Sequence, residues 1–165
     1  MQYMADCETG SNGDRAEGLR AARDAFYRGD IAQRIADYHR QNRGLIKMED
    51  LEDFEDEVED ALSADVFGTK VYSCGPWCQG PMLLQIMQLL QNANFVTMGH
   101  NSAPYIHHVT EAVKLAAADR ERWYGDPRFI DVPMDWLLSD AYAKKRRALI
   151  DPDTAWPGMP PSGDP

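Results

Sequence analysis

The sequence lacks a surplus of basic residues and lacks long hydrophobic runs. It has 27 acidic residues against 17 Lys and Arg, which gives a formal net charge of -10. Nucleic acids and anionic membrane surfaces are usually bound by surfaces rich in Lys and Arg. The longest strongly apolar stretch, residues 81–90, has about half of the roughly 20 residues that a membrane span needs. We therefore expect no nucleic-acid partner and no membrane association.

Cysteine is also scarce, with only Cys7, Cys74 and Cys78. This low, odd number excludes a disulfide framework of the kind found in small secreted domains. Three residues separate Cys74 from Cys78, whereas the usual redox motif has two. The first 14 residues have neither the basic start nor the apolar core of a secretory signal. They predict a disordered polar tail and do not indicate a compartment.

The remaining sequence predicts an α+β chain that is mostly helical, with helices around one β-hairpin. Apolar residues repeat at helical spacing in several segments, and Asp30 and Ser102 are suitable N-caps. Residues 58–66 and 69–73 predict two strands joined by a tight turn at Phe67-Gly68. Helices are expected over residues 16–27, 31–42, 81–90, 103–123 and 140–150, with a short element at 133–138.

The predicted layout has one partial domain, residues 15–150, between two tails. Residues 1–14 form the polar tail, and residues 151–165 form a flexible tail rich in Pro and Gly. Nine of the thirteen residues from Met48 to Asp60 are acidic, but the run contains no glycine of the kind that a calcium loop needs. We interpret it as a solvated face.

Few residues are candidates for catalysis or metal binding. His107 and Glu111 are four residues apart on one predicted helix face, but no third ligand is evident. We expect no metal and no cofactor. None of the internal threonines has an activating group beside it, and a catalytic threonine usually uses a free α-amine as its base.

Several segments, taken together and in order, resemble the gamma-glutamyltransferase (gamma-glutamyltranspeptidase) family. Each segment is short, and the similarity extends from about Ala21 to Asp153. The segments are Asp24-Ala-Phe-Tyr-Arg-Gly-Asp-Ile-Ala-Gln-Arg-Ile35, Gly44-Leu-Ile-Lys-Met-Glu-Asp-Leu51, Gly68-Thr-Lys-Val-Tyr-Ser73, Gly99-His-Asn-Ser-Ala103, Glu111-Ala-Val-Lys-Leu-Ala-Ala-Ala-Asp-Arg120, Tyr124-Gly-Asp-Pro-Arg-Phe-Ile-Asp-Val-Pro133 and Leu149-Ile-Asp151.

The resemblance implies an N-terminal-nucleophile hydrolase, of which this chain is a partial piece of the αββα fold. Such enzymes cleave themselves into two subunits, and the new N-terminal threonine attacks gamma-glutamyl amides such as glutathione. The similarity covers only the later part of the large subunit, so no family catalytic residue maps onto this sequence. We expect this chain alone to be inactive. Expected partners are the Thr-starting small subunit and the rest of the large subunit, or a second copy through exposed apolar surface. Bacterial relatives are often exported.

One loop departs from the family pattern. Many relatives have a loop rich in Pro, Ser and Gly where this sequence has Gly75-Pro-Trp-Cys-Gln-Gly80. The resemblance places this loop near the catalytic region, so Trp77 and Gln79 are the candidate substrate-binding residues, and another amide, such as an acylated amine, is a possible substrate. Two alternatives remain open: a non-catalytic interaction module derived from the fold, and a thiol- or metal-binding protein.

Overall fold

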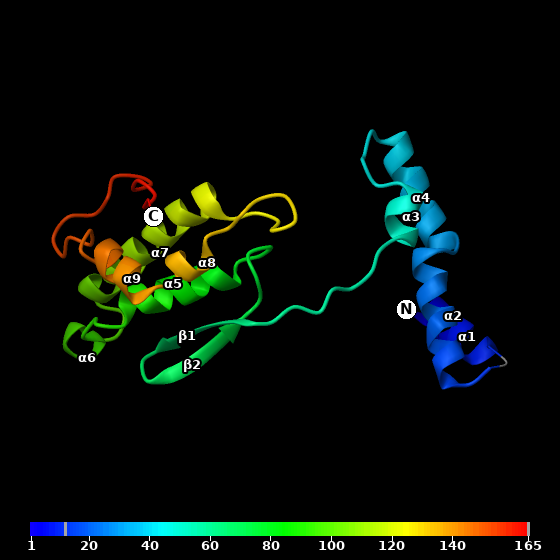
Figure 1. Cartoon of the computed structure of the whole chain (residues 1–165), viewed down its shortest axis with the longest axis horizontal. Coiled ribbons are helices and arrows are strands. Elements are labelled where there is room, and N and C mark those ends of the chain that lie inside the picture. The colour runs from blue at the N-terminus through cyan, green and yellow to red at the C-terminus, as the bar shows by residue number, and fades with distance from the viewer. Residues whose placement is uncertain (12, 165) are drawn as a thin grey trace. The chain divides into compact units, whose positions relative to one another are not determined.

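The computed structural model describes residues 1–11 and 13–164 and divides the chain after Val58 (Figure 1). One unit is Met1–Val58 and the other is Glu59–Pro165. The one partial domain predicted over residues 15–150 spans this division. Asn12 and Pro165, which belong to the two predicted tails, lie outside the described residues.

The first unit is a chain of helices in which each packs on the next. The middle of the acidic run lies against this unit's helices, because Arg23 donates a hydrogen bond of 2.9 Å to the main-chain oxygen of Phe54. The Phe54 ring also stacks on Tyr27, with the ring centres 5.3 Å apart. The helices are α1 (Gln2–Gly10), α2 (Arg15–Tyr27), α3 (Asp30–Gln41) and α4 (Met48–Glu52).

Helix α1 corrects the expectation of a disordered tail over residues 1–14. The Tyr3 hydroxyl donates a 2.7 Å hydrogen bond to Asp30, which links α1 to the start of α3. This hydrogen bond lowers the pKa of Asp30 and raises the pKa of Tyr3 to about 12. Asp30 was expected to cap α3 but is its first residue, and Gly29 occupies the cap position. A contact between residues 27 positions apart cannot be recognised from the local pattern of the tail.

The second unit begins with the predicted hairpin, β1 (Leu62–Val66) and β2 (Thr69–Ser73). The strands are antiparallel, and Ala64 lies opposite Val71. Phe67 and Gly68 both have positive φ, 52° and 75°, which suits the tight turn of a two-residue hairpin. The first strand was predicted to start at residue 58, but it starts four residues later, at Leu62.

Helix α5 (Gly80–Leu90) is the centre of the second unit (Figure 1). It contacts both strands and two helices, α7 (Ala103–Trp123) and α9 (Asp140–Arg147). Leu84 packs with Ala64 and Val66 on the hairpin side. On the other side, Leu89 and Leu90 pack with Ala112, Leu115 and Ala116 of α7. The remaining helices are α6 (Phe95–Met98), which the sequence analysis did not predict, and α8 (Met134–Leu137).

A buried ion pair joins α7 to α9. Asp119 and Arg146 are 1% and 3% exposed, and their closest oxygen and nitrogen are 3.0 Å apart. Arg146 also donates to the main-chain oxygens of Leu115 (3.1 Å) and Pro161 (2.9 Å). Asp119 accepts a 2.9 Å hydrogen bond from the amide of Gly163. The pair therefore fixes two helices and the C-terminal segment at one point.

Residues 151–164 form neither helix nor strand, but they are bound along α7. Lys114 donates to the main-chain oxygen of Trp156 (2.7 Å), and the Trp123 indole donates to that of Gly163 (3.0 Å). Together with the contacts of Asp119 and Arg146, these bonds anchor a segment that was predicted to be flexible from its Pro and Gly content. In the described part of the chain, no helix combines the length and the apolar character required to cross a membrane.

Candidate functional site

The loop between β2 and α5, residues 74–79, is held by one carboxylate. Glu59 accepts hydrogen bonds from the Gly75 amide (3.0 Å) and from the Trp77 indole (2.9 Å). The amide of Cys78 lies 3.5 Å from the carbonyl oxygen of Gly75, which closes a turn around Pro76. Glu59 thus fixes the start and the middle of the loop, and Trp77 has a defined position although its side chain is 40% exposed.

A second charged group lies over Trp77. The guanidinium carbon of Arg128 is 4.7 Å from the centre of the Trp77 ring, within the range of a cation–π contact. Arg128 also donates to the carboxylate of Asp126 and holds the pKa of that carboxyl below its usual value. The indole is therefore held at its nitrogen by Glu59 and at one ring face by Arg128.

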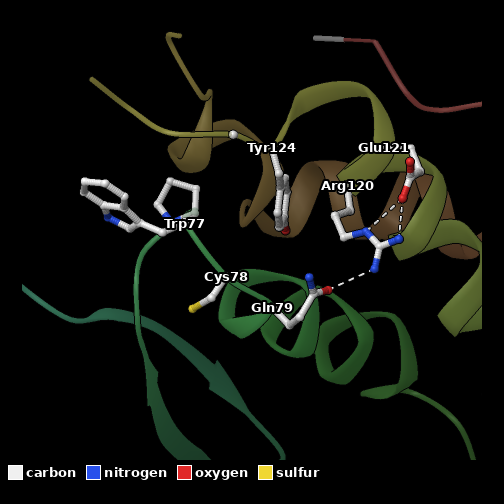
Figure 2. A pocket seen from close by; sticks show the side chains of 8 residues that line it. Trp77, Cys78, Gln79, Arg120, Glu121 and Tyr124 are labelled. Carbon is white, nitrogen blue, oxygen red and sulfur yellow. Dashed lines mark hydrogen bonds and ion pairs between the residues drawn. The ribbon is translucent and has the colours of Figure 1, made fainter. Parts of the chain in front are cut away.

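Gln79 contacts the end of α7. Arg120 donates a 3.0 Å hydrogen bond to the amide oxygen of Gln79, and the same guanidinium binds the carboxylate of Glu121. Figure 2 shows Gln79 and Arg120 pointing toward each other from α5 and α7. This contact joins the start of α5 to the last turn of α7, although the two residues are 41 positions apart in the sequence.

The loop and the end of α7 enclose a shallow pocket of about 270 Å³. The Tyr124 hydroxyl donates a 2.5 Å hydrogen bond to the buried side chain of Gln85. Burial and the nearby charge of Asp119 raise the pKa of Tyr124 above its usual value. The pocket therefore offers a cation, a carboxylate, an amide and an aromatic ring to a polar ligand. Its lining residues are Pro76, Trp77, Cys78, Gln79, Arg120, Glu121, Tyr124 and Gly125.

The pocket contains groups that can bind a ligand, but none of its lining residues is a threonine. The five threonines are distributed over the chain, and two of them use their hydroxyls within helices. Thr9 donates to the main-chain oxygen of Ala5 (2.9 Å) and Thr97 to that of Asn94 (3.0 Å). A hydroxyl that donates to a carbonyl in this way is not activated as a nucleophile, because activation needs a base that takes its proton.

The structure places both predicted site residues, Trp77 and Gln79, in this pocket. Three further lining residues were not predicted from the sequence, namely Arg120, Glu121 and Tyr124. The sequence offered one clue to two of these residues, since Arg120 ends one of the family-like segments and Tyr124 begins the next. Whether Trp77 and Gln79 contact a substrate remains a prediction.

His107 and Glu111, the possible metal ligands, bind the C-terminal segment instead. The Nε2 atom of His107 lies 2.7 Å from the main-chain oxygen of Asp151. Glu111 accepts hydrogen bonds from Lys114 (2.7 Å) and from the amide of Trp156 (3.1 Å). Burial alone would raise the pKa of Glu111, but these donors outweigh burial and lower it. Among residues 1–11 and 13–164, no three His, Cys, Asp or Glu side chains are grouped so as to hold a metal ion.

Comparison with known proteins supports the family assignment. Residues 15–163 match the family model described as gamma-glutamyltranspeptidase. The chain is 38% identical over 135 residues to the glutathione hydrolase proenzyme of Escherichia coli, covering 81% of this chain and 23% of that protein. It is 32% identical over 133 residues to the acylase ACY 1 proenzyme of Pseudomonas sp. (strain SE83), covering 80% and 24%.

A solved structure shows the same similarity in three dimensions. The crystal structure of Helicobacter pylori gamma-glutamyltranspeptidase is 32% identical and superposes with a TM-score of 0.76. The superposition covers 89% of this chain and 43% of that chain. Among the curated relatives given above, the chain spans about a quarter of each protein's length.

Proposed function

Because this chain belongs to the gamma-glutamyltranspeptidase family, we propose that it is the later part of the large subunit of an enzyme that transfers or hydrolyses gamma-glutamyl amides, such as glutathione. The proposal is supported by a match that spans residues 15–163 and by relatives that are several times longer than this chain. In the complete enzyme, the second unit would flank the layered αββα core of an N-terminal-nucleophile hydrolase.

The observation that carries this proposal is the pocket formed by the loop and α7. Its position after β2 corresponds to the loop that the family resemblance places near the catalytic region. Trp77 and Gln79 are held there by Glu59, Arg128 and Arg120 before any ligand arrives. Groups that are already positioned lose little freedom when they bind a ligand. We therefore assign Trp77 and Gln79 to the substrate-binding wall.

The attacking group would come from outside residues 1–165. A threonine that is freed at a chain start by self-cleavage has its own α-amine as the base. The amine takes the hydroxyl proton as the oxygen attacks the gamma-glutamyl carbonyl, and main-chain amides stabilise the oxyanion. This arrangement agrees with the threonine hydroxyls described above, which serve as main-chain donors in helices.

The expected partners are the Thr-starting small subunit and the remaining part of the large subunit. Several large apolar side chains are exposed to solvent, and these partners would bury them. Val96 is 92% exposed and Phe129 is 83% exposed, and Leu83 of α5 is half exposed. Burial of such side chains is a principal source of affinity between subunits. Self-association through the same residues is the alternative.

A second candidate function is acylase activity on acylated amines. It is favoured by the similarity to the acylase ACY 1 proenzyme and by Trp77 and Gln79, which lie in a loop that the family resemblance expects to be rich in Pro, Ser and Gly. A large aromatic ring in the wall would suit an apolar acyl or amine group better than a loop of small residues.

A chimeric enzyme would test the proposed function. The segment of the Escherichia coli glutathione hydrolase that matches this chain would be replaced by residues 15–163. We expect the chimera to cleave itself and to release p-nitroaniline from gamma-glutamyl-p-nitroanilide. Trp77→Ala and Gln79→Ala in the chimera should each raise KM by about tenfold, the loss expected for one ordered contact with substrate.

Tyr72→Ala is the matched control, because Tyr72 is an exposed aromatic residue on the neighbouring strand. It should leave both KM and kcat unchanged. A chimera that cleaves itself and hydrolyses only acylated amines would support the acylase. A self-cleaved chimera that acts on neither substrate would favour the non-catalytic module, and unchanged KM values in the Trp77 and Gln79 variants would refute the assigned wall.

A further inference from the structure

The two cysteines of the pocket loop lie next to each other and have no role in the proposed function. The sulfur atoms of Cys74 and Cys78 are 2.7 Å apart, and both side chains are exposed as free thiols. A disulfide bond is about 2.0 Å long. The pair therefore needs only a small movement to form a covalent bond, although its spacing differs from that of the usual redox motif.

The fold, rather than chance rotation, brings these thiols together. Cys74 follows β2, and the turn from Gly75 to Cys78 returns the chain toward it. A side chain at Gly80 would place its Cβ 2.8 Å from the Cys74 sulfur and 2.9 Å from the Cys74 carbonyl oxygen. The first turn of α5 can approach Cys74 so closely only because residue 80 is glycine.

The surroundings also make the two thiols chemically different. Hydrogen bonds from Cys78 and Ser73, with help from the Gly80 amide at the start of α5, lower the pKa of Cys74. The interaction with Cys74 raises the pKa of Cys78. The thiolate, rather than the thiol, is the nucleophile in exchange reactions. Cys74 is therefore suited to attack first, and Cys78 to complete the reaction.

We propose that Cys74 and Cys78 form a thiol–disulfide exchange site, in which a small organic disulfide reversibly converts the two thiols into one disulfide within the loop. The Cys74 thiolate attacks one sulfur of the organic disulfide, forms a mixed disulfide and releases one small thiolate. Cys78 then loses its proton to water and attacks the Cys74 sulfur, which releases the second small thiolate. The two cysteines lose two electrons, and the organic disulfide gains them.

Formation of this bond would affect the wall of the pocket without filling it. Figure 2 shows the Cys78 sulfur pointing away from Tyr124 and Arg120, so the bond would form on the side of the loop that faces away from these two residues. The closed ring contains Gly75, Pro76 and Trp77. Oxidation would restrict the part of the loop that carries Trp77, and it would link the conformation of the pocket to the thiol–disulfide balance around the protein.

The experiment uses the full chain and 2-hydroxyethyl disulfide, which has no gamma-glutamyl group, so its outcome does not depend on the proposed function. After incubation and acid quenching, the protein is digested with trypsin and analysed by mass spectrometry. Both cysteines lie in the single peptide between Lys70 and Lys114, whereas Cys7 lies in the peptide that ends at Arg15. We expect the peptide that contains Cys74 and Cys78 to lose two hydrogen atoms. Treatment with dithiothreitol should restore them.

Cys7 is the internal control, because it is a lone thiol that can form only a mixed disulfide. The loop peptide should react at least about tenfold faster than Cys7, as expected for a more ionised thiolate with a neighbouring thiol. In Cys78→Ser the reaction should stop at a mixed disulfide on Cys74, and in Cys74→Ser the rate should fall to that of Cys7. A loop peptide that stays reduced, or that carries two separate mixed disulfides, would overturn the proposal.

Discussion

Replacing Asp119 with alanine should lower the free energy of unfolding of the unit Glu59–Pro165 by about 3–5 kcal/mol. The substitution leaves the Arg146 guanidinium buried, at 3% exposure, without its carboxylate. Removal of one partner from a buried ion pair is costly because the remaining charge stays desolvated. The variant also loses the acceptor for the Gly163 amide, so the end of the C-terminal segment should be held less firmly against α7.

Tryptophan fluorescence in urea is the suitable measurement for this variant. All four tryptophans, residues 77, 123, 136 and 156, lie in the second unit, so the signal reports on that unit alone. Lys70→Ala is the matched control, because it removes one partner of the exposed pair between Lys70 and Asp65 in the same unit. The control should cost less than about 1 kcal/mol. A similarly small cost for Asp119→Ala would show that the pair does not hold the unit together.

Leu84→Ala should destabilise the same unit by about 2–5 kcal/mol. Leu84 has no exposed surface and fills the space between α5 and the hairpin, where it packs against Ala64 and Val66. Truncation loses the burial of the removed atoms and leaves a cavity that neighbouring residues fill only in part. Because α5 follows the pocket loop directly, we also expect the contact between Gln79 and Arg120 to weaken.

Leu83→Ala provides the comparison on the same helix, because Leu83 is half exposed. It should change the free energy of unfolding by less than about 1 kcal/mol when both variants are followed by tryptophan fluorescence in urea. Equal losses for the two leucines would mean that α5 does not present one face to the hairpin as described. Such a result would also remove the support that the core gives to the position of the pocket loop.

The second unit was predicted well because its signals are local. The turn at Phe67-Gly68 requires positive φ, and glycine at its second position makes this pattern readable in the sequence. Ser102 caps α7 by accepting a 3.3 Å hydrogen bond from the Tyr105 amide, as its position predicts. The family match and the superposition on a solved relative confirmed the family resemblance and the mostly helical α+β class.

The features that were missed depend on contacts between distant residues. Helix α1 is linked to α3 through Tyr3 and Asp30, and the C-terminal segment is held by buried groups of α7 and α9. The pocket has the same origin. Trp77 and Gln79 could be singled out because their loop departs from the family pattern, whereas the position of Arg120 beside Gln79 follows from the packing of α5 against α7.

In the proposed enzyme, Trp77 and Gln79 form part of the substrate wall, and the attacking threonine lies outside residues 1–165. The most direct test incubates the purified chain with gamma-glutamyl-p-nitroanilide and measures both the release of p-nitroaniline and the intact mass of the quenched protein. We predict no turnover and no added gamma-glutamyl group. Steady release of p-nitroaniline, with the acyl group bound covalently to a side chain of residues 1–165, would contradict the account.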